Sequence, residues 1–183
     1  MSYATGDPTL ESLVPRGSPL RSGALVGLAL ALLVAAWFLP PLLQPGLFGS
    51  SGGGSSIVVG PQRVVSTAML QPHGLGGVRV TRVDPVPGAH VVDAWVVEGD
   101  RSAPSDPTPA SDEVLAALGA GPTTHLPRAV RSGGTATLVV LWHVDDCAAL
   151  VDDGPTVHVA SGWVTRAEQI PWSPFGESGL CGA

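Results

Sequence analysis

The chain has 183 residues and a formal net charge of −6, and it contains nine Arg but no Lys and no Asn. The absence of Asn excludes N-glycosylation, which needs an Asn acceptor. The part after residue 56 carries seven Arg against thirteen acidic residues, so the whole net negative charge lies there. Because nucleic acids and anionic lipid headgroups attract basic proteins, this balance argues against either as a ligand of that part.

An uncharged and almost wholly apolar run covers residues 24–43 (ALVGLALALLVAAWFLPPLL). A bilayer core about 30 Å thick needs about 20 such residues in a helix, so the run predicts a transmembrane helix in contact with lipid. Arg16 and Arg21 precede the run, and no basic residue follows it before Arg63. The positive-inside rule therefore places residues 1–23 in the cytoplasm and everything after the span outside. We expect a single-pass protein of the cell membrane.

A cleaved secretory signal is the alternative interpretation of the same run. The flanking charge fits a signal peptide, but residues 37–41 (WFLPP) stand where a cleavage site needs small residues. The hydrophilic lead is also long for a signal, so the sequence favours an uncleaved anchor. Either interpretation exports the C-terminal part. Residues 13–18 (LVPRGS) are similar to the thrombin site of expression vectors, which we interpret as coincidence; otherwise Arg21 alone supports the orientation.

Residues 44–56 (QPGLFGSSGGGSS) predict a flexible linker, because Gly and Ser leave the backbone free. The remaining residues, 57–183, have the length of one domain. Cys147 and Cys181 are the only cysteines, and both fall in the exported part, where oxidising conditions let disulfides persist. No C-x-x-C pair is present and no Cys stands beside a His. We therefore expect a structural disulfide in preference to a metal pair or a catalytic thiol.

Short strand patterns divided by Pro and Gly fill most of this domain. Apolar alternation and β-branched runs predict strands over residues 63–70, 78–83, 90–98, 135–144 and 156–165, with Gly162 as a bulge in the last. Residues 111–119 are the one helical candidate, with Ser111 as the N-cap and Gly119 at the C-terminus. These elements predict a mainly β fold, an Ig-like β-sandwich with one short helix. "Ig-like" refers to architecture alone, because the Cys…Trp…Cys order of antibody domains is absent.

Two groups of side chains are candidates for a metal site. Asp145, Asp146, Asp152 and Asp153 flank residues 147–151, and carboxylates brought together by a hairpin can bind Ca²⁺. The EF-hand spacing is absent, so solvated turn residues are the favoured interpretation. His143 and His158 would approach each other if the last two long strands pair, which would allow a copper or zinc site. Hydrogen-bonded or exposed His residues are favoured there, and no cofactor is expected.

Motifs for nucleophilic catalysis are missing: the chain has no G-x-S-x-G elbow and no S-x-x-K, and its only tyrosine is Tyr3 in the tail. We therefore do not expect an enzyme. Trp172 and Phe175 stand in a Pro-rich stretch near the C-terminus. They either pack beneath the disulfide, which is favoured, or contact a protein partner.

The layout resembles that of uncharacterised single-pass proteins of actinobacteria, which combine a short tail, one span, a Gly/Ser linker and an exported β-rich domain. A composition rich in Ala, Gly, Pro and Val and free of Lys fits a high-GC genome. The resemblance concerns architecture and transfers no functional residue. It implies a non-catalytic accessory or interaction protein of the cell envelope with a protein partner. The alternatives are an extracytoplasmic ligand- or metal-binding module and, third, an envelope hydrolase.

Overall fold

The computed structural model describes residues 19–43, 53–72, 77–104, 110–151, 153–162, 164–171, 174–175 and 180–181. The chain divides into two compact units, Met1–Leu39 and Pro40–Ala183. The LVPRGS stretch and residues 44–52 of the predicted linker lie outside the described residues.

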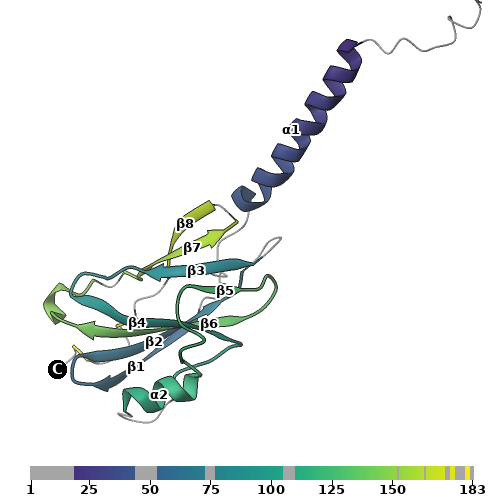
Figure 1. Ribbon diagram of the computed structural model, residues 1–183. Coiled ribbons are helices and arrows are strands. Elements are labelled where there is room, and N and C mark those ends of the chain that lie inside the picture. Colours follow the sequence, from purple (N-terminus) through teal and green to yellow (C-terminus); the bar gives the residue numbers. More distant parts are fainter. Residues whose placement is uncertain are drawn as a thin grey trace, which may run out of the picture. The chain divides into compact units, whose positions relative to one another are not determined.

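Helix α1 spans Pro19–Leu43 (Figure 1). Its described side chains, over residues 23–39, are apolar, and large ones such as Leu25 (68% exposed) and Leu33 (69% exposed) have no neighbour covering them. Over the part of the chain that the structure describes, no helix combines enough length with enough apolar character to cross a bilayer. The membrane span stays a prediction made from the sequence.

The second unit is mainly β, as predicted, and contains two antiparallel four-stranded sheets (Figure 1). Sheet A has the order β1-β2-β6-β4, formed by Gly54–Gly60, Arg63–Leu70, Ala136–Val144 and Ala89–Glu98. Sheet B has the order β5-β3-β7-β8, formed by Arg128–Val130, Val78–Val83, Thr156–Ser161 and Val164–Gln169. Helix α2 (Ser111–Leu118) and a short 3₁₀ turn (Cys147–Ala149) complete the unit.

Strand β6 contributes to two separate cores, one on each of its faces. Leu138, Val140 and Trp142 are buried between the sheets, whereas Val139 and Leu141 are buried on the outer face beneath α2. The alternation predicted for residues 135–144 is confirmed. A strand that is apolar on both faces needs a cover on both, and α2 supplies the outer one through its buried Val114 and Leu118.

Strand β4 changes face at a bulge, which alternation in the sequence does not reveal. The register with β6 shifts between Val91 and Asp93, so Val91 packs against the inter-sheet core together with Ala94 and Val96. Strict alternation from Ala94 and Val96 would place Val92 on that face, but Val92 is 46% exposed. One extra residue in a strand reverses the faces before it, which explains the difference.

Three other boundaries differ from the prediction. Instead of one strand over residues 156–165, residues 156–169 form a hairpin of β7 and β8, and Gly162, with φ of 60°, lies between the strands rather than in a bulge. Strand β1 begins at Gly54, inside the expected linker, because it pairs with β2 and the Ser55 and Thr67 hydroxyls lie 2.9 Å apart. Ser111 does not cap α2; the N-cap is Ala110, without a side-chain hydrogen bond, whereas Gly119 closes the helix with φ of 80° as predicted.

The predicted disulfide between Cys147 and Cys181 is present, with Cα atoms 5.6 Å apart and a sequence separation of 34. Closing a loop of this length stabilises the fold by about 3–4 kcal/mol in the chain-entropy model. Cys147 lies in the 3₁₀ turn, which packs against the turn between β3 and β4. There the Gly88 carbonyl accepts hydrogen bonds from the backbone N–H groups of Asp145 (2.8 Å) and Asp146 (3.1 Å).

We predict that Gly88→Ala destabilises the domain by about 3 kcal/mol. Gly88 has φ of 78°, and an added Cβ would lie 2.4 Å from the Asp146 carbonyl oxygen, so backbone strain and a collision add together. The matched control is Gly99→Ala, where φ is 87° but nothing lies within 4 Å, so strain alone costs about 1–2 kcal/mol. Urea unfolding of the full chain in mild detergent measures both. Equal losses for the two variants would contradict the close contact at Gly88.

Candidate functional site

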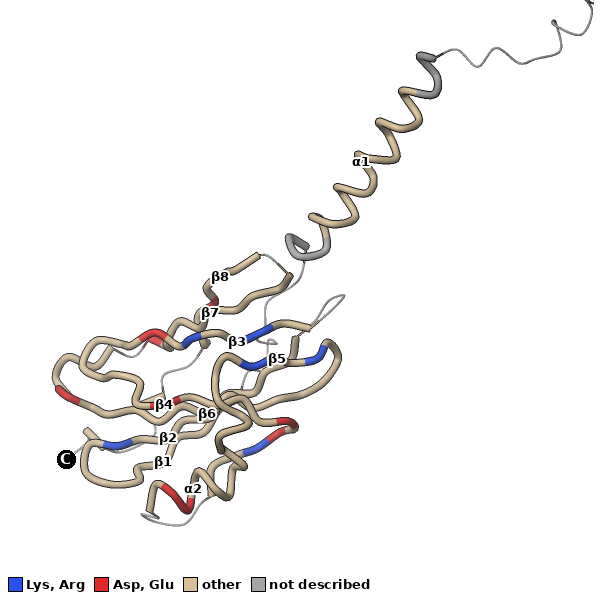
Figure 2. Tube along the Cα trace, viewed as in Figure 1, with Lys and Arg blue, Asp and Glu red and all other residues tan. Residues whose placement is uncertain are grey.

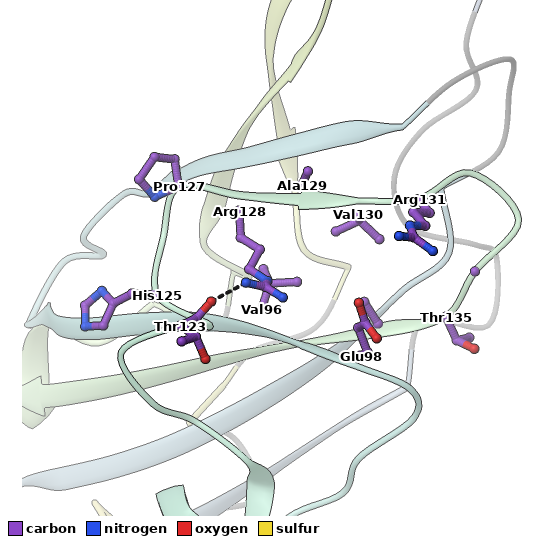
Figure 3. Close-up of a pocket in the computed structure, with 12 residues that line it drawn as sticks. Val96, Glu98, Thr123, His125, Pro127, Arg128, Ala129, Val130, Arg131 and Thr135 are labelled. Atoms are coloured by element: carbon purple, nitrogen blue, oxygen red, sulfur yellow. Dashed lines mark hydrogen bonds between the residues drawn. The ribbon is translucent and has the colours of Figure 1, made fainter.

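A cleft of about 510 Å³ opens where β4, an edge strand of sheet A, lies near β5, an edge strand of sheet B (Figure 3). Its apolar lining combines the buried side chains of Val96, Val130 and Ala136 with the exposed Pro127 and Ala129. Its rim includes the charged residues Glu98, Arg128 and Arg131. A volume of this size is ordinary for a small-molecule or short-peptide site, and an apolar wall with a few polar groups is the usual composition of one.

The chain builds this cleft by crossing from sheet A to sheet B. Residues 119–127, the crossing segment, lie between α2 and β5 and pass the outer edge of β4. There the Val96 N–H donates to the Thr124 carbonyl (2.8 Å) and the Leu126 N–H donates to the Ala94 carbonyl (3.1 Å). The cis peptide bond Leu126–Pro127 follows, and β5 starts at the next residue. The crossing segment covers β4 as far as Val96 and leaves the end of the strand at Glu98 bordering the cleft.

The charged groups of the cleft come from both sheets. Arg128 donates from its guanidinium to the Thr123 carbonyl, which orients the side chain across the cleft (Figure 3). Arg131 and Glu98 are both exposed, and within the described part of the chain no ion pair joins them. Figure 2 shows basic positions on β3 and β5 and acidic ones on α2. Two guanidinium groups against one carboxylate make the cleft locally basic in an acidic unit.

Histidine–aspartate pairs are the second recurring feature, and the sequence did not predict them. His125 lies on the cleft, where its Nε2 is 2.8 Å from Asp93 and its ring packs edge-on against Trp95. His90 Nδ1 lies 2.7 Å from Asp145, and His143 lies 3.8 Å from the same carboxylate.

The third pair, on sheet B, joins His158 of β7 to Asp84, which follows β3, at 2.7 Å. Arg82 Nε also contacts the Asp84 carboxylate, at 2.9 Å. The hydrogen bond from His158 and, to a lesser degree, the positive charge of Arg82 hold the pKa of Asp84 below its usual value, although partial burial opposes them. The ionised carboxylate is the form that this cluster stabilises.

The predicted metal residues are not brought together where the structure describes them. Asp145 pairs with His90, Asp146 accepts from the Ala148 N–H at 2.9 Å, Asp153 is exposed, and Asp152 lies outside the described residues. Among the side chains that are described, no group of three or more His, Cys, Asp or Glu is arranged to hold a metal ion. The cation hypothesis for the complete Asp set stays a prediction.

The condition for an approach of His143 and His158 is not met, because β6 and β7 belong to different sheets. The ring beside His143 is that of His90, at a centroid distance of 5.2 Å, because β4 rather than β7 pairs with β6. Phe175 is buried and its ring lies edge-on to Trp142 at a centroid distance of 5.5 Å, which agrees with the favoured interpretation that this residue packs in the domain. Trp172 lies outside the described residues.

The cleft residues carry no local signal that sequence reasoning would recognise. Arg128 and Arg131 are separated by two residues, but so are Arg79 and Arg82, which do not line the cleft. Glu98 ends a strand that was correctly predicted, and the strand it faces has only three residues. The site depends on two sheet edges meeting, which is a property of topology.

We predict that Asp84→Asn lowers the stability of the domain by about 1 kcal/mol at neutral pH. A carboxyl group whose folded pKa is depressed contributes stability above its unfolded pKa, near 3.8, and loses that contribution as the pH falls through the folded pKa. The difference between wild type and variant should therefore shrink below about pH 4. Urea unfolding at pH 7, 5 and 3 measures it. Asp100→Asn, at an exposed position, is the control and should show little effect at any pH; an Asp84→Asn effect that persists at pH 3 would contradict the assignment.

Comparison with protein-family models, with curated proteins and with solved structures finds no match for this chain.

Proposed function

We propose that the protein is a membrane-anchored, non-catalytic interaction protein of the cell envelope. Its N-terminus lies in the cytoplasm, residues 24–43 anchor it, and an Ig-like β-sandwich outside the membrane binds a partner. The observation that carries the binding role is the cleft between the edges of β4 and β5, which presents two guanidinium groups beside apolar walls.

The chemistry of the cleft supports recognition rather than catalysis. Arginine stays protonated in proteins, so Arg128 and Arg131 bind anions but do not exchange protons with a substrate. The imidazole on the cleft, His125, already contacts Asp93 through Nε2. Apolar side chains supply the remaining contact area, and this combination of a few oriented charges with an apolar wall is typical of a binding site.

Two features support the proposed location in the membrane with the β-rich unit outside the cytoplasm. Residues 24–43 contain no charged side chain, and the Arg residues flanking this run lie on its N-terminal side. The disulfide between Cys147 and Cys181 lies in the unit that would be exported. Disulfides form and persist mainly in oxidising compartments, so its presence agrees with a location outside the cytoplasm.

For the anchor, we predict that the full chain sediments with membranes and resists extraction by alkaline carbonate. Replacing Leu32 and Val34 together by Arg should release it into the soluble fraction, because each Arg near a span centre costs roughly 2.5–3.5 kcal/mol of insertion free energy. The control is the apolar pair Leu32→Ile and Val34→Leu, which should remain in the membrane. A wild-type chain found in the soluble fraction, or an Arg variant retained as well as the control, would refute the anchor.

For the partner, we expect the chain to co-purify from its native host with a larger envelope assembly after mild-detergent extraction. Affinity purification with a C-terminal tag, followed by size-exclusion chromatography and mass spectrometry, tests this expectation. A chain with the apolar helix exchanged for that of an unrelated membrane protein is the control and should keep the same partner, since the sandwich supplies the contact. A chain that always elutes alone would count against an interaction role.

A further inference from the structure

We infer that the cleft binds an extended peptide segment of a partner protein, that the segment pairs with the outer edge of β4, and that an acidic side chain of the segment binds Arg128 and Arg131. This inference rests on the proposed function and names the chemistry of its partner.

Backbone groups at the outer edge of β4 point away from sheet A, in the direction from which a peptide strand would pair. The Ala94 carbonyl and the Val96 N–H both bond to the crossing segment, so both point to the outer edge of the strand. In an antiparallel sheet this direction repeats every second residue, so the backbone groups of Glu98 point the same way. The Gly99 N–H, in the opposite phase, donates inward to the Thr135 carbonyl at 2.9 Å, as this alternation requires.

The crossing segment already shows that this edge accepts an added strand. His125 forms an antiparallel bridge with Trp95, flanked by the two hydrogen bonds to Ala94 and Val96. The segment runs antiparallel to β4, joins this edge at Thr124, opposite Val96, and leaves it at Pro127, so within the described residues it forms no bridge at the level of Glu98. Exposed strand edges are used in many complexes to bind an extended peptide, with main-chain hydrogen bonds giving affinity and side-chain pockets giving specificity. At Glu98 the edge continues into the cleft without this cover.

The cleft also presents two positive charges, those of Arg128 and Arg131. Arg128 uses one nitrogen of its guanidinium on the Thr123 carbonyl, which holds the group in place while its other N–H donors remain for a ligand. Arg131 lies at the start of the loop from β5 to β6, and it also lines the cleft. Planar guanidinium groups bind carboxylates through paired hydrogen bonds, so an Asp or Glu side chain is the matching group. Glu98 on the rim repels a second acidic side chain of the peptide at the position opposite Glu98.

The walls of the cleft decide in favour of a peptide over a nucleic acid or a lipid surface. The exposed Pro127 and Ala129 offer apolar contact for alternate side chains of a strand, beside the buried Val96, Val130 and Ala136. The net charge of −6 repels a polyanion, whereas a single carboxylate on a short segment interacts with the two local cations. The ligand class is thus an extended segment that carries one acidic residue among apolar or β-branched ones.

Selection of phage-displayed random linear peptides on the immobilised full chain in mild detergent tests the inference. Peptides enriched on the wild-type chain should share an Asp or Glu beside apolar or β-branched residues. A synthetic copy of the most enriched peptide should bind the Arg128→Gln and Arg131→Gln variants about tenfold more weakly each. Changing its acidic residue to the amide should cause the same loss. Arg63→Gln, at an exposed position on β2 outside the cleft, should bind like wild type.

Hydrogen exchange gives a second readout that does not depend on an Arg variant. The bound peptide should slow exchange of the Glu98 amide, because that N–H gains a partner, while the Gly99 amide changes little. The inference would be overturned if the enriched peptides carried no Asp or Glu, or if they bound the Arg variants as tightly as the wild-type chain. It would also be overturned if the wild-type chain enriched no peptides relative to a chain with both Arg128→Gln and Arg131→Gln. Displacement of the peptide by sodium acetate at a concentration no higher than that of the peptide would also overturn it, because the cleft would then be a site for free small carboxylates.

The outcome separates this inference from the proposed function. A double Arg128→Gln, Arg131→Gln chain that still co-purifies with its envelope partner refutes the cleft and leaves the interaction role intact. A wild-type chain that selects acidic peptides but is always purified alone from its host supports the cleft and argues against the interaction role.

Discussion

The domain depends on strand β6 being covered on both faces. Leu138, Val140 and Trp142 are sealed by sheet B, and Val139 and Leu141 by α2. Trp142 is the largest fully buried side chain, and its indole N–H, which would be costly to bury alone, donates to the Ser66 hydroxyl at 2.8 Å. Because β6 lies between β2 and β4, its burial fixes the positions of both neighbours. Loss of either cover would expose the large apolar side chains on that face to water.

The cleft is a consequence of the same arrangement. To deliver α2 to the outer face of sheet A and then return to sheet B, the chain must pass the edge of β4, and it does so as a short bridge at His125. A strand that stayed on this edge for its full length would close the sandwich there. The segment pairs only with the stretch of β4 from Ala94 to Val96 and then leads through Pro127 into β5, a strand of three residues, so the edge at Glu98 stays open. The cleft thus lies beside the stretch of β4 that the crossing segment leaves unpaired.

Local patterns predicted the elements well where burial is one-sided or continuous, and they failed where topology decides. Apolar and β-branched residues located β2 and β3 at their observed bounds, but the register shift of β3 between Val80 and Arg82 was not predicted. The bulge at Val92, the hairpin at Gly162 and the pairing of His143 with His90 all depend on which strands become neighbours. The disulfide was predictable because two cysteines allow one pairing. Arg128 and Arg131 were counted only as charges, since nothing near them in sequence distinguishes them from Arg79 and Arg82.

The proposed anchor and the proposed cleft fit together energetically. A strand edge, two Arg side chains and a modest apolar wall form a small contact, and association in solution costs several kcal/mol of lost freedom before any affinity appears. Confining both partners to one membrane removes much of that cost, because binding then occurs at a high effective concentration set by the tether. The Gly- and Ser-rich composition of residues 44–53 predicts a flexible connection with a root-mean-square reach of about 17 Å, which would keep the sandwich near the bilayer. A site of this size therefore suits a partner that is held at the same membrane better than one that diffuses freely.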